Sequence, residues 1–337
     1  MVGMLDIFSD NPAFAQTEMT VAVNKRPFVP GKLGQMGLFA EKGITTTSVA
    51  IEELSGSLSL VPVTNRGDDP VRIKNPKRIM RQLTVPHLAT EKRIKASEVQ
   101  GVTQFGNPNA LQTMQAVVQD KLDQQTRSHD ATVEYQRIGA MKGIIYDADG
   151  TTVIYDLFNE FGVTQQTQPI AFSTGTTEVR TLLTDAAGMI EDELGADTYE
   201  RLFCFCDALY FKALISHPTV KAAYSNYQQA EGIRTGDLRY QGFTFGGVTF
   251  QQYRGKVGAT PFIEANTGYI FPIGVPDLFI TRFAPADDFN SVNSIGLPRY
   301  SKIAVDPKYQ QWVDVMVESN PISLCTRPRC VVKTTAS

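Results

Sequence analysis

Apolar side chains recur at helical spacing in one long stretch in the middle of the chain. The apolar positions of this face are Leu111, Met114, Val118, Leu122 and Val133. Three- and four-residue steps place such positions on one side of a helix. The pattern predicts a helix over about 109–141, roughly 45 Å long at a rise of 1.5 Å per residue. Because no sustained heptad is present, we interpret it as the strut of an extended subunit rather than as a coiled coil.

Alternating polar and apolar residues predict a long hairpin-like loop before this helix. Residues 44–63 alternate loosely and are rich in Thr, Ser, Val, Ile and Leu, as extended strands are. A dense cluster of turn residues follows at 65–70, and residues 71–74 alternate again. Two strands around a polar tip would therefore span about 44–85.

The rest of the chain mixes short helices and strands. Hairpins are predicted at 143–155, around an Asp-Ala-Asp-Gly turn, and at 243–250, where Gly246 and Gly247 supply the positive φ angles of a two-residue turn. Helices are predicted at about 177–194, 197–214 and 218–226. Further strands are predicted near 268–273, 277–282, 312–318 and 329–334. Strands and helices do not alternate as in βαβ units, so the pattern favours an α+β fold.

Residues 1–40 are predicted to form an arm rather than a domain. Apolar side chains there are sparse and out of phase, and Pro12, Pro27 and Pro30 interrupt any period. An arm of this length cannot bury much of itself. It must lie on something else, which is either its own core or a neighbouring copy.

Composition removes several classes of protein. The chain has 337 residues, 42% of them hydrophobic, and 32 Lys and Arg against 35 Asp and Glu, so it can bury a large core. No run of about 18 apolar residues is present, and no basic leader precedes Asp6, so we expect neither a membrane span nor a secretory signal. The cysteines are Cys204, Cys206, Cys325 and Cys330. Their spacing does not match a zinc site, and we expect packed, reduced thiols, with a disulfide between neighbouring copies as the alternative.

Charge is concentrated in one stretch of the chain. Between Thr64 and Lys95 there are nine basic and three acidic residues, which give a net charge of +6. Because the net charge of the whole chain is −3, the remaining residues have a net charge of −9. An extended basic loop on an acidic body could dock on another copy of the chain. A merely solvated loop is the alternative, and a nucleic-acid arm would need interleaved aromatics that this stretch lacks. The candidate inter-subunit contacts are Arg66, Asp68, Asp69, Arg72, Lys74, Lys77, Arg78 and Arg81.

Motifs for chemistry are missing. The sequence contains no phosphate-binding Walker loop, no zinc-protease histidine pair and no Gly-x-Ser-x-Gly elbow. The Asp-Ala-Asp-Gly turn lacks the glycine and glutamate that a calcium loop needs at its sixth and twelfth positions. His87, His129 and His217 lie far apart, and we expect them on the surface or on helix faces. No catalytic residue, cofactor site or metal site is predicted.

Two segments near the C-terminus carry a resemblance to a known family. They are RFAPADDFNSVNSIGLPRYSK at 282–302 and ESNPISLCTRPR at 318–329. Together with KGIIYDADG at 142–150 and the segment 51–63, they resemble tailed-phage major capsid proteins of the lambda E type. The resemblance runs over essentially the whole chain in the expected order, and it implies the HK97-like capsid fold.

The resemblance also implies a division of the chain. Residues 1–40 would be the N-terminal arm and 41–86 the extended E-loop. Residues 87–198 would form the peripheral domain, with the long helix as its spine, and 199–307 the axial domain. The last strands, in 308–337, would return to the peripheral domain.

The function implied is that of a structural, non-enzymatic major capsid protein that self-assembles into the icosahedral or prolate head shell around phage DNA. Its partners would be other copies in pentamers and hexamers, a decoration or cement protein, a scaffold, a portal and, non-specifically, packaged DNA, but no membrane. It would assemble in the host cytoplasm and reside in the virion. No Lys–Asn pair for covalent cross-linking is identified. The alternatives are an encapsulin-like or other virion shell protein and a soluble enzyme with a site assembled from distant residues.

Overall fold

The computed structural model divides the chain into two compact units. It describes residues 16–25, 31–55, 77–99, 103–104, 107–111, 114–226, 242–257 and 260–336. The first unit comprises Met1–Val49, Gln82–Gln136 and Ile280–Ser323, and the second Ala50–Arg81, Arg137–Phe279 and Leu324–Ser337. In the described part of the chain, no helix has both the length and the apolar character to cross a membrane.

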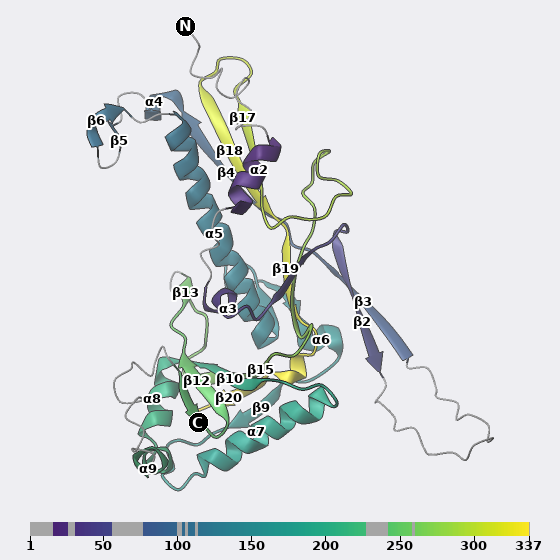
Figure 1. Cartoon of the computed structure of the whole chain (residues 1–337), viewed down its shortest axis with the longest axis vertical. Helices are drawn as coiled ribbons and strands as arrows, with labels where there is room; N and C mark the ends of the chain where they lie inside the picture. Colours follow the sequence, from purple (N-terminus) through teal and green to yellow (C-terminus); the bar gives the residue numbers. More distant parts are fainter. Residues whose placement is uncertain are drawn as a thin grey trace, which may run out of the picture. The chain divides into compact units, whose positions relative to one another are not determined.

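The first unit is built on a three-stranded antiparallel sheet in the order β17-β18-β4 (Figure 1). The strands are β17 (Tyr300–Val305), β18 (Trp312–Ser319) and β4 (Leu88–Lys95). Two helices, α2 (Gln16–Lys25) and α5 (Met114–Lys142), supply the other layer of the core. The predicted long helix is thus confirmed, although it begins at Met114 because residues of the predicted start belong to β6 (Asn107–Leu111).

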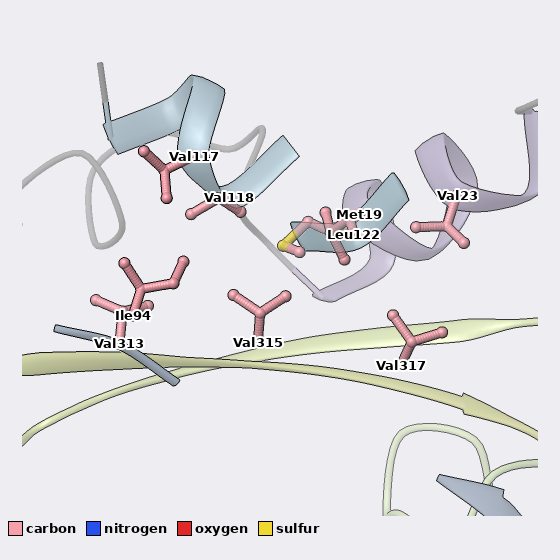
Figure 2. Packing of buried hydrophobic residues seen from close by; sticks show 9 residues of the cluster. All are labelled: Met19, Val23, Ile94, Val117, Val118, Leu122, Val313, Val315 and Val317. Carbon is pink, nitrogen blue, oxygen red and sulfur yellow. The ribbon is translucent and has the colours of Figure 1, made fainter. Parts of the chain in front are cut away.

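The core of this unit lies between the sheet and the two helices α2 and α5 (Figure 2). The strands contribute Ile94, Val313, Val315 and Val317, and the helices Met19, Val23, Val117, Val118 and Leu122. Every second residue of β18 faces the helices, while Met19 and Val23 on α2, like Val118 and Leu122 on α5, lie four positions apart. Full burial of each such side chain stabilises the unit by about 1.5–3 kcal/mol.

Helix α2 corrects the prediction that residues 1–40 lack an ordered period. Met19 and Val23 lie one helical turn apart and are both buried. Two apolar residues are too weak a signal in a sequence, because most of the stability of such a helix comes from tertiary packing. The arm was expected to lie either on its own core or on a neighbouring copy, and residues 16–25 pack on the core of their own chain.

The described residues that follow α2 contact the same unit. After α2, the short helix α3 (Lys32–Gln35) is fixed by Glu134, whose carboxylate accepts hydrogen bonds from the backbone amides of Leu33 at 2.8 Å and Gly34 at 3.3 Å. Strand β1 (Ala40–Gly43) then pairs in parallel with β16 (Phe279–Phe283), which also neighbours β19 (Pro321–Cys325).

A two-stranded ribbon confirms the base of the predicted long hairpin. It consists of β2 (Ser48–Ser55) and β3 (Lys77–Thr84). The predicted strand segments within 57–63 and 71–74, and the turn cluster at 65–70, lie outside the described residues. Short elements follow β4 in the chain, namely α4 (Ala96–Val99) and the pair β5 (Thr103–Gln104) and β6.

The second unit contains a six-stranded mixed sheet in the order β11-β12-β10-β15-β20-β9. Its strands are β9 (Gln166–Pro169), β10 (Arg201–Cys206), β11 (Phe243–Phe245), β12 (Val248–Gln252), β15 (Thr267–Ile273) and β20 (Val332–Thr335). Strand β10 pairs in parallel with β12 and antiparallel with β15. The β11–β12 hairpin turns through Gly246 and Gly247 at φ values of 60° and 82°, which confirms the predicted turn.

The longer helices that follow β9 in the chain also belong to this unit. Helix α7 (Val179–Leu194) contacts β9, β15 and β20, while α8 (Ala208–Ser216) contacts β12 and is followed by α9 (Pro218–Asn226). The predictions of α7 and α9 are confirmed. The predicted helix over 197–214 is wrong, because its first half is strand β10.

The reason for that error is the burial of every residue of β10 after Arg201. Residues 202–206 are all buried, so the strand lacks the alternation that distinguishes a strand from a helix in a short apolar run. Helix α8 begins after it at Asp207, whose carboxylate accepts a hydrogen bond from the backbone amide of Leu209 at 2.9 Å. The predicted helix over 197–214 therefore combined strand β10 and helix α8, which Asp207 separates.

Smaller elements complete the unit. Strands β7 (Ile144–Tyr146) and β8 (Val153–Asp156) form the predicted hairpin, followed by α6 (Leu157–Phe161). Strands β13 (Lys256–Val257) and β14 (Thr260–Pro261) pair with each other. The strand predicted at 329–334 begins only at Val332, since Pro328–Cys330 form a 3₁₀ turn.

The four cysteines are buried, free thiols, as the composition predicts. Because β10 is a strand, Cys204 and Cys206 point to the same face rather than in the different directions that a helix would give them. Burial raises the pKa of the Cys204 thiol well above its ordinary value and that of Cys330 to about 12. The raised pKa keeps the Cys204 and Cys330 thiols protonated at neutral pH, which makes these two thiols poor nucleophiles.

Candidate functional site

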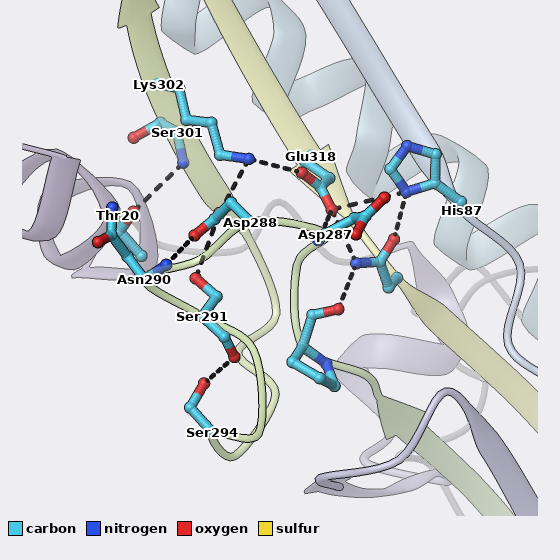
Figure 3. A network of polar contacts seen from close by, with 12 residues as sticks. Thr20, His87, Asp287, Asp288, Asn290, Ser291, Ser294, Ser301, Lys302 and Glu318 are labelled. Carbon is cyan, nitrogen blue, oxygen red and sulfur yellow. Dashed lines mark hydrogen bonds and ion pairs between the residues drawn. The ribbon is translucent and has the colours of Figure 1, made fainter.

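A polar network lies where β18 leaves the sheet of the first unit (Figure 3). Its centre is the buried carboxylate of Glu318, which lies 3.3 Å from the ammonium group of Lys302 on β17. The same carboxylate accepts hydrogen bonds from the backbone amide of Asp287 at 3.2 Å and from the side-chain amide of Asn320 at 3.0 Å. A buried carboxylate is tolerated only with such partners.

The network fixes the start of a long loop, residues 284–299, that connects β16 to β17. Lys302 also contacts Asp288 at 2.9 Å. Partial burial alone would raise the pKa of the Asp288 carboxyl, but the ion pair with Lys302 and the hydrogen bonds from Asn290 and Ser291 outweigh burial, so this pKa lies below its ordinary value. The Lys302 pKa is raised, because Asp288 and Glu318 outweigh the effect of its own burial.

The end of the loop is fixed by a second set of contacts. The guanidinium group of Arg299 forms a buried ion pair with Asp130 on α5. Asn24 on α2 donates to the carbonyl oxygen of Arg299 at 2.8 Å and accepts from its backbone amide at 3.1 Å. Three segments that are far apart in the sequence therefore meet at one residue, and the arm helix is attached to the loop.

The three histidines occupy different environments. His87 is about half exposed and its Nδ1 lies 2.8 Å from the side-chain oxygen of Asn320. His129 is buried on α5, with Nε2 at 3.0 Å from the hydroxyl of Thr90, and burial together with the charge of Arg299 lowers its pKa to about 4. His217 is buried at the end of α8, with Nε2 at 3.0 Å from the carbonyl oxygen of Thr174. Two of the three are therefore interior side chains.

The structure describes only some of the eight candidate inter-subunit contacts that the charge pattern indicated. Arg66, Asp68, Asp69, Arg72 and Lys74 lie outside the described residues, and Lys77 and Arg78 lie at the start of β3. Arg81 contacts its own unit: its guanidinium donates to the carbonyl oxygens of Glu160 at 2.7 Å and Phe161 at 3.2 Å, at the end of α6. The described part of the hairpin thus assigns Arg81 to a local contact.

The arrangement of these side chains holds segments of the first unit together. Among the described residues, no group of three or more His, Cys, Asp or Glu side chains is placed to hold a metal ion. The charge-based candidates did not include Lys302, Glu318, Asp288 or Arg299. The only sequence signal for these four is their position in the two segments, 282–302 and 318–329, that carry the family resemblance.

Comparisons with known proteins agree over nearly the whole chain. The family described as phage major capsid protein E matches residues 15–336. The major capsid protein of Pseudomonas phage KPP10 is 31% identical over 339 residues, covering 95% of this chain and 96% of that protein. The major capsid protein of Salmonella phage Felix O1 is 26% identical, covering 96% of each. In fold, the chain is similar to the capsid of cyanophage P-SCSP1u, with a TM-score of 0.53, 13% identity and coverage of 93% and 90%.

Proposed function

The chain belongs to the family of phage major capsid protein E, and on that premise we propose that it assembles, through pentamers and hexamers, into an icosahedral or prolate head shell around phage DNA. It is a structural protein of the virion capsid, its α+β fold is HK97-like, and capsids of this kind contain many copies of the subunit. The observation that carries the proposal is the family match over residues 15–336.

The subunit is proposed to act without catalysis. This is supported by membership of a structural family and by the chemistry of its interior. Burial raises the pKa of the Cys204 and Cys325 thiols, and it disfavours the charged form of His129 by lowering its pKa. The polar groups around Glu318 are paired with one another across segment boundaries, which suits a fixed shape.

The division of the chain into capsid parts remains a proposal. It assigns the arm to 1–40, the E-loop to 41–86, the peripheral domain to 87–198, the axial domain to 199–307 and the returning strands to 308–337. The two compact units divide the chain differently. Their boundaries fall within the proposed E-loop, at 49/50 and 81/82, within the peripheral domain at 136/137, within the axial domain at 279/280 and within the returning strands at 323/324.

The E-loop is proposed to dock on the acidic surface of a neighbouring copy. The support is the net charge of +6 between Thr64 and Lys95 on a chain that is otherwise net acidic, together with the ribbon β2–β3, whose second strand contains Lys77, Arg78 and Arg81 of this stretch. Complementary charge of this kind steers association and register more than it adds affinity. Lys77 and Arg78 remain candidates with the five residues of the tip, whereas Arg81 already contacts α6.

Further partners are proposed from the same family membership. They are a scaffold, a portal and a decoration or cement protein, with packaged DNA contacting the inner face non-specifically. Assembly is proposed to take place in the host cytoplasm, before the shell becomes part of the virion.

The test is expression of the full chain together with the other head proteins of its phage, followed by electron microscopy and sedimentation. We expect shells or capsomers. A single inert monomer under all conditions would contradict the proposal. The same assay applies to the triple variant Arg72→Glu, Lys74→Glu and Arg78→Glu, for which we expect folded subunits and a loss of shells.

The control for net charge is a second triple variant in the second unit, Arg201→Glu, Lys212→Glu and Arg254→Glu, since these three side chains are exposed. It changes the total charge by the same amount. Normal shells from the E-loop variant, or an equal loss of shells from both variants, would refute electrostatic docking by this loop.

A further inference from the structure

The 284–299 loop exposes large apolar side chains in a group. Phe289 is fully exposed, Val292 and Ile295 expose 57% and 66% of their surface, and Leu297 exposes 40%. Single exposed apolar residues are normal on a soluble protein and need no explanation. Four within nine residues, which we call the patch, are a local concentration of exposed apolar side chains, and such a concentration is typical of an interaction site.

The backbone under this patch is held in one shape. The carboxylate of Asp288 accepts from the backbone amide of Asn290 at 2.9 Å, and the backbone oxygen of Asp288 accepts from Val292 at 2.9 Å. Further along, the backbone amide of Leu297 donates to the hydroxyl of Tyr300 at 2.8 Å. An unrestrained loop would fold its apolar side chains inward, so these bonds keep Phe289 and its neighbours outside.

The loop is also attached to β1 by close contact of two backbones. The amide of Gly296 donates to the carbonyl oxygen of Ile44 at 2.8 Å. A Cβ atom on Gly296 would overlap the carbonyl oxygen of Phe283, and one on Gly43 would overlap the carbonyl oxygen of Gly296. Only glycine allows this approach. With the ion pairs of Lys302 at one end and Arg299 at the other, the loop is pre-organised, which reduces the entropy lost on binding.

The chemistry of the patch selects among partners. From Phe289 to Pro298 the chain carries no Asp, Glu, Lys or Arg, although charged residues make up 20% of the whole sequence. Nucleic acid requires basic side chains, so this surface does not suit DNA. Depletion of charge together with an aromatic anchor is typical of the centre of a protein–protein interface.

We propose that the 284–299 loop is a contact surface for a second copy of this chain in the assembled shell, with Phe289 as its anchor. The inference rests on the proposed function, since a shell surrounds every subunit with further copies. A loop of this size covers roughly a few hundred Å², whereas a specific interface on its own needs about 1,000 Å² or more. The contact therefore forms only together with others, which leaves the free subunit soluble and the patch exposed until assembly.

The contact is tested by the variant Phe289→Cys, because the four native thiols are buried. A maleimide reagent should label the introduced thiol readily in free subunits and at least tenfold more slowly in shells. In shells assembled from a mixture of ¹⁴N- and ¹⁵N-labelled subunits, a short bifunctional reagent should join this position to a peptide of a differently labelled copy. Equal labelling rates in subunits and shells would overturn the inference, as would a cross-link that leads only to another virion protein.

A second measurement separates this inference from the proposed function. The double variant Phe289→Ser and Ile295→Ser should fold normally, since both side chains are exposed, but give at least tenfold fewer shells. The control Val153→Ser with Leu209→Ser removes two exposed apolar side chains elsewhere and should assemble as wild type. If wild type and both variants assemble equally, the inference fails and the proposed function stands. If wild type forms no shells, the proposed function fails.

Discussion

The two units fill their interiors in different ways. Of the seven buried Asp, Glu, Lys and Arg side chains among the described residues, six lie in the first unit, and the seventh, Arg137, lies on α5 in the second. The second unit is filled instead by aromatic rings and thiols. Phe203, Phe205 and Phe271 have ring centroids 5.2–5.8 Å apart, and all four cysteines are buried in this unit.

The difference follows from how each unit is assembled along the chain. The first unit joins three separate stretches, and its buried charges connect them: Arg299 binds Asp130, and Asn24 binds the backbone of Arg299. Most of the second unit is the continuous stretch Arg137–Phe279, whose parts are already neighbours. A directional ion pair specifies which distant segments meet, while apolar packing is non-directional. We infer that the buried charges of the first unit select its arrangement and contribute little net stability.

The largest expected effect comes from breaking the buried pair. In Arg299→Met, the Asp130 carboxylate stays buried without its guanidinium partner, and the free energy of unfolding should fall by about 3–5 kcal/mol. Urea unfolding of the full chain measures it. The double variant Arg299→Met with Asp130→Leu removes both charges and should recover most of the loss. A double variant as unstable as the single one would show that the pair itself is a major source of stability.

A smaller effect, of about 3 kcal/mol, is expected from pH at His129. Burial lowers its pKa to about 4 from an ordinary value near 6.5. The folded state therefore resists protonation, while the unfolded state takes up a proton below about pH 6.5. The stability due to His129 is fully present above pH 6.5 and is lost as the pH falls toward 4, at about 1.4 kcal/mol per pH unit.

The measurement compares wild type with His129→Gln by urea unfolding at pH 7 and pH 4. Between these values, wild type should lose about 3 kcal/mol more than the variant, since all other titrating groups are shared. Arg299 also opposes a positive charge at this position. Parallel pH profiles for the two proteins would show that His129 is protonated in the folded state or reaches solvent.

The elements that the sequence predicts are those whose signal is local. Helix α5 is found from its repeating apolar face, and the β11–β12 turn from Gly246 and Gly247. Strand β10 was mistaken for a helix because all its inner residues are buried, and α2 was missed because only Met19 and Val23 mark it. Strand β4 alternates, but its outward positions and many of its inward ones are polar, so its register is set by pairing with β18.

Some residues of the candidate site could likewise be identified from the sequence and others could not. A charge count along the sequence identified the basic stretch that contains the E-loop tip. It could not identify the partners of Glu318, because Lys302 and His87 come from other segments that meet Glu318 only in the folded unit. The exposure of Phe289 was equally hidden, since an apolar residue in a sequence gives no sign of whether it faces a core or solvent.

The smallest expected effect lies in the apolar interior of the second unit, at Cys204. Its thiol is fully buried, and the carbonyl oxygen of Phe205 lies 3.7 Å from its sulfur, too far for a hydroxyl group. Cys204→Ser should lower the free energy of unfolding by about 2 kcal/mol, because it moves a more polar hydroxyl group into a fully buried position. Cys204→Ala loses only packing and should cost about 1 kcal/mol. Serine has the closer shape, so a lower cost for alanine would show that this interior selects for apolarity. If Cys204→Ser proved more stable than Cys204→Ala, the interior of the second unit would tolerate a polar group as the first does. The two interiors would then differ only in the residues they contain.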